Sequence, residues 1–319
     1  MNISVLGCGR WGSFHAWYAN SIGHKVTLWG RTGSTNLNRL VQTGRNDYLT
    51  LSSDILLTDN LQQAVQTADI CIVSINAQQF RSLAKRLKKE TDLSEKPLVL
   101  CMKGLEIGTG KRLSEVASEE LGSHAPVAVW VGPGHVQDFV RHMPNCMVIS
   151  STRQKLTENL VQTLTGPLIR FYYGRDLLGT EIGAAAKNVM GIAAGMLDGL
   201  NYTSLKGALM ARGTHELSRL IAAMGGQAMT VYGLSHLGDY EATLFSPYSN
   251  NRRFGEEWIK GKQTSYLAEG YYTSEALMNL SEQYKVELPI SRTVYEITHK
   301  GIDPKAGLER LFLRSLKDE

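Results

Sequence analysis

The feature that most constrains the fold is the segment GCGRWG at residues 7–12, which directly follows the apolar run Ile3–Leu6. In such a G-x-G-x-x-G, the first glycine allows a tight turn, the second lets the backbone approach a ligand, and the third lets helix and strand pack closely. The N–H groups of the following helix then face the phosphates of that ligand. The motif therefore predicts a dinucleotide site at Gly7, Gly9 and Gly12; the alternative is a glycine-rich turn without a ligand.

The N-terminal part of the chain alternates short β-branched runs with helical patterns such as Gln79–Lys89 and Leu113–Leu121. This alternation indicates βαβ units and a mostly parallel, doubly wound sheet. The predicted strands are Ile3–Leu6, Lys25–Trp29, Ile70–Ser74, Leu98–Met102, Val127–Val131, Cys146–Ser150 and Arg170–Tyr173.

The strand signal stops near residue 178, and longer helical periods follow. We therefore expect an α/β Rossmann-type domain over residues 1–178 and an all-helical domain, holding substrate and catalytic groups, over residues 179–319. The predicted helices of the second domain are 181–200, 204–224, 256–262, 273–285, 290–299 and 304–316.

Composition excludes several classes of function. A net charge of +4 suits a small anionic ligand and is too weak to indicate nucleic acid. The four cysteines form no CxxC pair and the histidines no HxxxH spacing, so we expect a reduced cytoplasmic protein without a metal site. The N-terminus begins as a strand and not as a signal peptide, and no run is apolar enough for membrane insertion.

The second predicted strand, KVTLW, ends just before Arg31, where dinucleotide folds usually carry an acidic residue that reads the ribose. No Asp or Glu occurs before Asp47. An arginine at this place can pair with a 2′-phosphate or stack on adenine. NADPH is therefore a plausible cofactor, and NADH stays open.

Two further motifs follow predicted strands, at the sheet edge where ligands of open α/β sheets bind. Lys103 follows Leu98–Met102, and Gly132–Pro133–Gly134 follows Val127–Val131. A lysine there attracts an anionic substrate, and a glycine turn lets backbone N–H groups approach it. The alternative for Lys103 is an ordinary solvated lysine.

The helix predicted over 181–200 reads EIGAAAKNVMGIAAGMLDGL and places Lys187 in a row with Gly183, Gly191 and Gly195. Glycine inside a helix costs about 1 kcal/mol relative to alanine, so the row indicates that a neighbouring helix or a ligand comes very close. Lys187 could transfer the proton that hydride chemistry on a carbonyl requires, with Asp239 as its carboxylate partner. The alternative is a helix-packing ridge whose lysine reaches solvent.

Together these segments resemble the bacterial NAD(P)-dependent sn-glycerol-3-phosphate dehydrogenases from residue 1 to about 300. The resemblance implies a Rossmann domain with a helical domain, a homodimer, and reduction of dihydroxyacetone phosphate for phospholipid synthesis. The motifs that carry it are GCGRWG, CMKG at 101–104, GPG at 132–134, the 181–200 helix, ARGTHELSRL at 211–220, LGDYEAT at 237–243, SNNRRFG at 249–255 and LAEG at 267–270.

By this resemblance Lys187 is the proton donor and acceptor, and Lys103 and Asp239 are its catalytic companions. Implied cofactor contacts, beyond the glycines, are Arg10, Trp11, Arg31, Lys103, Val136, Leu267 and Glu269. Implied substrate contacts are Lys103, Gly132, Gly134, Lys187, Asn188, Asp239, Ser249, Asn250, Asn251 and Arg252.

The chain departs from the family pattern at two substrate positions. Gly134 stands where the family usually has serine, and Asn250 stands where it has an arginine that grips phosphates. Asparagine cannot replace the charge of a bidentate arginine. Arg252 or Arg253 could compensate; a related small 2-hydroxy or 2-keto substrate and a non-catalytic NAD(P)-binding sensor are the remaining alternatives.

Overall fold

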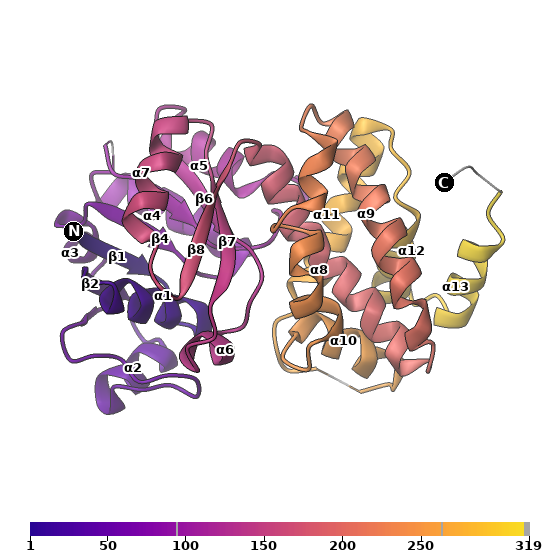
Figure 1. The fold of residues 1–319 in the computed structure, drawn as a ribbon, viewed down its shortest axis with the longest axis horizontal. Helices are drawn as coiled ribbons and strands as arrows, with labels where there is room; N and C mark the ends of the chain where they lie inside the picture. Colours follow the sequence, from indigo (N-terminus) through magenta and orange to yellow (C-terminus); the bar gives the residue numbers. More distant parts are fainter. Residues whose placement is uncertain (94, 263, 316–319) are drawn as a thin grey trace. The chain divides into compact units, whose positions relative to one another are not determined.

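A computed structural model describes residues 1–93, 95–262 and 264–315 (Figure 1). The chain divides into two compact units. The first consists of Met1–Met102 and Arg112–Leu177, and the second of Lys103–Lys111 and the chain from Leu178 onward.

The first unit contains an eight-stranded sheet with the order β3-β2-β1-β4-β5-β6-β7-β8. All neighbouring strands pair in parallel except β6 and β7, which are antiparallel, so the predicted doubly wound sheet is confirmed. The strands are β1 (Asn2–Leu6), β2 (Lys25–Trp29), β3 (Leu56–Thr58), β4 (Ile70–Val73), β5 (Leu98–Leu100), β6 (Val127–Val131), β7 (Asn145–Ser150) and β8 (Ile169–Gly174).

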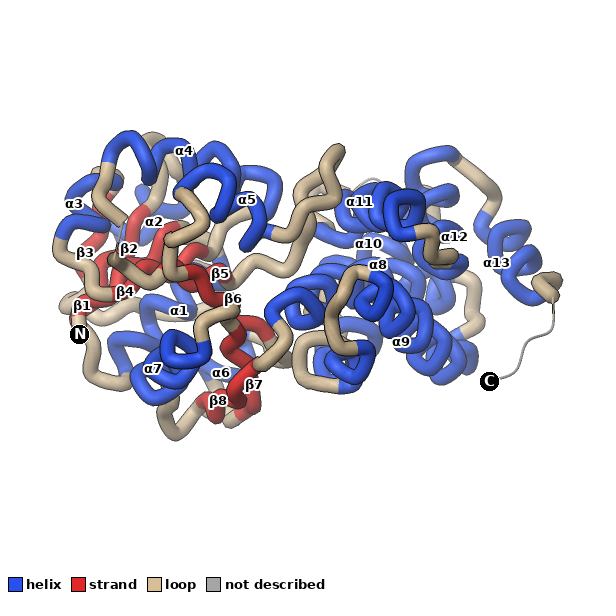
Figure 2. The backbone as a smooth tube through the Cα atoms, turned by 90° about the horizontal axis from the view of Figure 1, so that it is seen from above, coloured by secondary structure: helices blue, strands red, loops and turns tan. Residues whose placement is uncertain are grey.

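Helices cover both faces of this sheet (Figure 2). Alternate residues of β1 point to opposite sides: Val5 packs in a core with Phe14, whereas Leu6 packs in a core with Phe80. The first core includes α1 (Arg10–Ser21), α2 (Thr35–Thr43) and α7 (Gln154–Leu164); the second includes α3 (Leu61–Gln66), α4 (Phe80–Glu90) and α5 (Leu113–Leu121). A short helix α6 (Val136–Val140) follows β6.

Strand β3 was not predicted from the sequence. It is three residues long, and Leu56 is half exposed, so it lacks the apolar run that marks a buried strand. Pairing with β2 in the folded sheet is what makes it a strand.

Every named element of the second unit is helical. Its α-helices are α8 (Leu177–Gly199), α9 (Lys206–Ala223), α10 (Asn250–Ile259), α11 (Glu269–Tyr284), α12 (Pro289–Lys300) and α13 (Pro304–Phe312). Helix α8 is apolar on nearly all sides and is buried from Thr180 to Leu197, as expected for a helix at the centre of a bundle. Residue 316, where the last predicted helix ends, lies outside the described residues.

Glycines bring the backbones around α8 into close contact. A Cβ on Gly195 would lie 1.8 Å from the carbonyl oxygen of Arg252, and one on Gly255 would lie 2.0 Å from that of Ile192. A Cβ on Gly270, near the start of α11, would lie 2.5 Å from the Asn188 carbonyl oxygen. The small residues of α8, α10 and α11 are therefore required by helix packing.

The sequence predicted α10 only from residue 256. It begins six positions earlier because the Ser249 side chain accepts a hydrogen bond from the backbone N–H of Arg252 and caps the helix. Helix α11 likewise begins before its predicted start, at Glu269.

The segment Lys103–Lys111 belongs to the second unit, whereas the sequence assigned it to the first. Leu105 is fully buried in the helical core, and Gly110 (φ 70°) packs against α11. The Asn279 side chain donates a hydrogen bond to the Gly108 carbonyl at 3.2 Å. These contacts place Lys103 among the helices.

Within the described ranges, no helix combines the length and apolar character that a bilayer span needs. In the same residues, no group of three His, Cys, Asp or Glu side chains is placed to hold a metal ion.

Candidate functional site

Lys187 lies inside the second unit on α8, with a side chain only 7% exposed. Its ammonium contacts the Asp239 carboxylate at 2.6 Å and donates a hydrogen bond to the Thr243 hydroxyl at 2.7 Å. Lys187 thus does not reach solvent, and the carboxylate partner expected from the sequence is in contact with it.

Asp239 connects two lysines. Its Oδ2 atom lies 2.8 Å from the Lys103 ammonium as well as 2.6 Å from that of Lys187, and its side chain is 1% exposed. Its other oxygen, Oδ1, is buried and has no hydrogen-bond partner in the described chain. A buried carboxylate is tolerated here because two cations balance its charge. Lys103, Lys187 and Asp239 form what we call the lysine–aspartate cluster.

The environment moves Lys187 into the range useful for proton transfer. Burial lowers the pKa of Lys187 from 10.5 to about 7, the Asp239 charge opposes this change, and the Lys103 charge adds to it. At neutral pH the amine can therefore either donate or accept a proton.

His236 and Tyr240, which the sequence did not single out, form a buried hydrogen-bonded pair that flanks Asp239 in the chain. The His236 ring nitrogen Nδ1 donates to the Gly183 carbonyl at 2.8 Å, so Nε2 accepts from the Tyr240 hydroxyl at 2.7 Å. Burial, with a smaller contribution from the Lys187 charge, lowers the pKa of His236 to about 4. His236 is therefore neutral at pH 7 and adds no second positive charge beside Lys187.

Thr243 was also missed, although it stands in the quoted segment LGDYEAT. The sequence signal was its spacing, because residues four apart on a helical turn face the same way, as Asp239 and Thr243 do. Asn188, which was predicted, donates from its side chain to the Lys103 carbonyl at 2.7 Å. Asn188 therefore ties the segment that carries Lys103 to α8.

The glycine row beside Lys187 faces other parts of the second unit. A Cβ on Gly191 would lie 2.9 Å from Thr243 Cγ2, and one on Gly183 would lie 3.1 Å from His236. The row is therefore a packing surface, which lets the chain around Asp239 and Thr243 approach Lys187.

The nucleotide motif in the first unit has the geometry that its glycines predict. Gly7 has φ 120°, and a Cβ there would lie 2.2 Å from the Ser74 carbonyl oxygen. A Cβ on Gly12 would lie 1.7 Å from the Gly7 oxygen. Gly9, which precedes α1, has nothing within 4 Å of its Cβ position. Gly7 and Gly12 serve the turn, while the open space at Gly9 before a helix N-terminus fits a dinucleotide phosphate.

Three more predicted cofactor residues lie near this motif. The Arg10 guanidinium stacks 4.8 Å from the centre of the Tyr48 ring and donates to the Gln137 side chain. Trp11 packs edge-on against Phe14. Arg31 is exposed after β2, as a contact to a ribose or its phosphate requires.

The glycine turn after β6 has its own structural cause. Gly134 has φ 130°, and a Cβ there would lie 2.5 Å from the Phe139 ring, so the serine usual in the family does not fit this backbone. Gly132 has φ 144° and packs on Met147. Val136 is fully buried in the first-unit core, so its side chain is not available to a cofactor.

The predicted phosphate-binding segment forms the start of α10. Asn250 donates from its side chain to the Leu267 carbonyl at 3.3 Å, and Asn251 accepts from the Gly270 N–H at 2.9 Å. Leu267 is partly exposed, and Glu269 begins α11.

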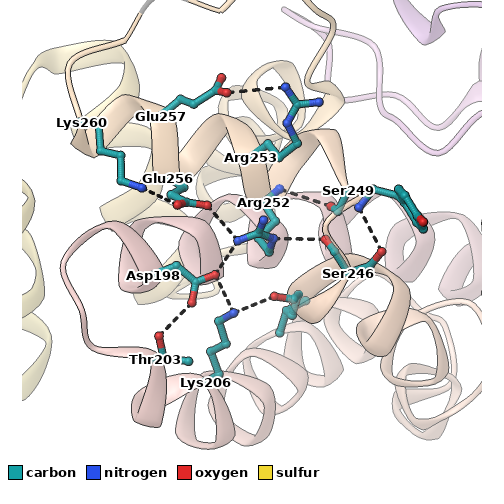
Figure 3. A network of polar contacts seen from close by, with 12 residues as sticks. Asp198, Thr203, Lys206, Ser246, Ser249, Arg252, Arg253, Glu256, Glu257 and Lys260 are labelled. Carbon is teal, nitrogen blue, oxygen red and sulfur yellow. Dashed lines mark hydrogen bonds and ion pairs between the residues drawn. The ribbon is translucent and has the colours of Figure 1, made fainter.

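Arg252 is occupied by internal contacts (Figure 3). Its guanidinium binds the Asp198 carboxylate at 2.8 Å, the Glu256 carboxylate at 3.0 Å and the Ser246 carbonyl at 3.1 Å. Two carboxylates balance its charge, so the structure does not support the predicted compensation for Asn250 by Arg252. Arg253 is 46% exposed and lies 3.6 Å from Glu257.

Comparison with known proteins decides the family. The sequence-family model of the NAD-dependent glycerol-3-phosphate dehydrogenase N-terminus matches residues 2–157. The family model of the C-terminus matches residues 176–309. The chain belongs to this family. The resemblance predicted from the motifs is confirmed.

Members of the glycerol-3-phosphate dehydrogenase family match over the full length. The chain is 34% identical to glycerol-3-phosphate dehydrogenase [NAD(P)+] of Thermoanaerobacter sp. (strain X514), covering 100% of this chain and 99% of that one. It is 35% identical to the enzyme of Fusobacterium nucleatum, covering 100% and 98%. The crystal structure of glycerol-3-phosphate dehydrogenase from Coxiella burnetii superposes with a TM-score of 0.92 at 28% identity, covering 98% and 99%.

Proposed function

We propose that this chain is an NAD(P)-dependent glycerol-3-phosphate dehydrogenase, which interconverts dihydroxyacetone phosphate and sn-glycerol 3-phosphate. The observation that carries the proposal is Lys187, buried against Asp239 with a pKa near 7, in a chain of this family. Reduction of the ketone consumes one hydride and one proton, and the buried lysine supplies the proton.

The lysine–aspartate cluster performs the proton transfer. When bound, a nicotinamide cofactor would supply the hydride for the carbonyl carbon. The Lys187 ammonium donates its proton to the carbonyl oxygen as negative charge develops there, and the neutral amine takes it back in the oxidation direction. Asp239 holds Lys187 in place, and the Lys103 ammonium adds positive charge that stabilises the oxyanion.

The first unit binds the cofactor at Gly9 and the N-terminus of α1, with Arg10, Trp11 and Arg31 around it. The exposed Arg31 can pair with the 2′-phosphate of NADPH. Substitution Arg31→Ala is expected to raise the KM for NADPH more than the KM for NADH.

The neutral Asn250 favours one alternative, a related dehydrogenase for another small 2-keto compound. No arginine stands at this position, and the charge of Arg252 is balanced by Asp198 and Glu256. Asn250→Arg is expected to lower the KM for dihydroxyacetone phosphate if the wild type accepts that substrate weakly.

The test follows oxidation of NADH or NADPH at a panel of phosphorylated and unphosphorylated 2-keto compounds. Turnover of dihydroxyacetone phosphate that is lost in a folded Lys187→Met variant supports the proposal. Turnover only of an unphosphorylated ketone moves the assignment to the paralogous enzyme. Cofactor binding without turnover on any compound points to a sensor.

Three further properties belong to the same proposal: a homodimer, a cytoplasmic location and a role in phospholipid synthesis. Light scattering at assay concentrations tests the first. Fractionation of cells that express the chain tests the second. Dependence of growth on added glycerol after deletion of its gene tests the third.

A further inference from the structure

A buried lysine, Lys206, and a partly buried arginine, Arg252, hold the end of the turn that carries Thr243. The Lys206 ammonium donates to the Leu244 carbonyl at 2.9 Å, and the Arg252 Nε donates to the Ser246 carbonyl at 3.1 Å. Both carbonyls lie at the C-terminal end of the π-helical turn η5 (Glu241–Phe245). The last carbonyls of a helical turn have no partner within the turn and are favoured by nearby positive charge.

Asp198, near the end of α8, anchors both cations (Figure 3). Its carboxylate binds the Lys206 ammonium at 2.7 Å and the Arg252 guanidinium at 2.8 Å, and it accepts from the Thr203 hydroxyl at 3.0 Å. Burial alone would raise the pKa of Asp198, but hydrogen bonds from Lys206, Arg252 and Thr203, together with the Lys206 charge, lower it. We call Asp198, Lys206 and Arg252 the Asp198 cluster.

The turn that this cluster holds places two groups on Lys187. Thr243 lies within η5 and accepts from the Lys187 ammonium at 2.7 Å, and Asp239 ends η4 (Leu237–Asp239), two residues before η5. A single π-helical turn is rare, and one turn of helix is not stable in isolation. Contacts from outside the turn must therefore maintain it, and the Lys206 ammonium supplies one of them at the carbonyl of Leu244, the residue that follows Thr243.

We propose that Lys206, anchored by Asp198, is a positioning residue that keeps Thr243 and Asp239 against Lys187. Lys206 does not touch the reacting atoms and acts through the Leu244 carbonyl. The proposal rests on the proposed function for its effect on turnover. The expected effect of Lys206 on the titration of Lys187 does not depend on any substrate.

The experiment measures the titration of Lys187 in the intact protein by NMR with ¹³Cε-labelled lysine. The signal is assigned by its loss in Lys187→Arg. In Lys206→Met, Asp198 keeps Arg252 and Thr203 as partners, so no buried charge is left alone. When Thr243 is held less firmly, the Lys187 ammonium loses a hydrogen-bond acceptor. The midpoint of the Lys187 titration therefore falls by about 0.5 to 1 pH unit.

The other groups that face Lys187 are Asp239 on η4, Lys103 on the 103–111 segment, and His236 before η4. His236 is neutral above about pH 4, so it does not contribute a competing step near pH 7. The matched control is Lys260→Met, because Lys260 pairs with Glu256 on the exposed side of α10 and does not touch η5. We expect no shift of the Lys187 midpoint in this control.

Turnover gives the second measurement. Lys206→Met should lower kcat about tenfold or more with little change in KM, because small misplacements of catalytic groups are costly. In a Thr243→Val background, Lys206→Met should lower kcat much less, because Lys206 is proposed to act through Thr243.

An unchanged Lys187 midpoint in a folded Lys206→Met variant, or a fully additive double variant, overturns the proposal. If the Met variant unfolds, Lys206→Gln replaces it, since the amide can still donate to the Leu244 carbonyl. It is then expected to show a smaller shift in the same direction, and no shift counts against the proposal. Absence of turnover in the wild type, with the midpoint shift present, refutes only the proposed function.

Discussion

Replacing Asp239 by asparagine tests the core of the proposed chemistry. The substitution keeps the shape of a side chain that is 1% exposed and removes the charge that two ammonium groups share. Lys187 would then lie near Lys103 without a carboxylate between them. A buried ammonium without a counter-charge loses its proton more readily, so the pKa of Lys187 must fall.

The magnitude follows from the geometry. Two unit charges about 4 Å apart interact by about 4 kcal/mol at an effective dielectric constant of about 20. One pKa unit corresponds to about 1.4 kcal/mol, so the pKa falls by about 2 to 3 units. Starting from about 7 in the wild type, Lys187 would be almost fully neutral at physiological pH.

The assay is the pH dependence of kcat for ketone reduction. Reduction needs the protonated amine, so wild-type activity falls as pH rises through about 7. In Asp239→Asn this fall moves to lower pH, and activity at pH 7 drops about 100-fold or more. Asp54→Asn, an exposed acid in the first unit, serves as the control. A wild-type profile that is flat through pH 7, or an unshifted limb in Asp239→Asn, would refute the reasoning.

Three further sets of variants have expected outcomes. Lys187→Met should lower turnover by about 10² to 10⁴. In the wild type, Lys187 raises the free energy of unfolding by up to about 1.4 kcal/mol per pH unit between about pH 7 and 10.5, because the unfolded state binds more protons there. Lys187→Met should remove this pH dependence, and chemical denaturation at several pH values measures it. Gly195→Ala should cost about 1–3 kcal/mol by forcing α8 from α10, whereas Gly207→Ala, with open space at its Cβ, should stabilise slightly; thermal unfolding compares them. Gly9→Ala should keep the melting temperature and weaken cofactor binding, whereas Gly12→Ala should lower the melting temperature, as fluorescence titration and calorimetry would show.

The sequence predicted most of the fold because local patterns determine it. Buried parallel strands such as Ile70–Val73 are continuous apolar runs, and a glycine motif marks the turn before α1. The sequence-based predictions were wrong where contacts outside the local pattern determine whether an element forms or where it begins. Strand β3 exists through pairing with β2, and α10 starts early because of a single serine cap.

The candidate site shows the same division. Lys187 was singled out because a lysine among small residues is conspicuous, and Asp239 because a buried lysine needs a carboxylate. His236 and Lys206 were missed because nothing local distinguishes a buried histidine or lysine from an exposed one. Only the folded chain brings Lys206 to the Leu244 carbonyl, which is 38 residues away.

The insertion of Lys103–Lys111 among the helices has a consequence for how this catalytic unit can be moved between proteins. A fragment that starts at Leu178 contains Lys187 and Asp239 but lacks the second cation of the carboxylate and the Leu105 side chain of the helical core. Domain shuffling at the apparent boundary would therefore transfer an incomplete proton-transfer centre. A transplantable version needs the loop from position 103 to be grafted as well, or the chain to be permuted so that this loop is joined directly to α8.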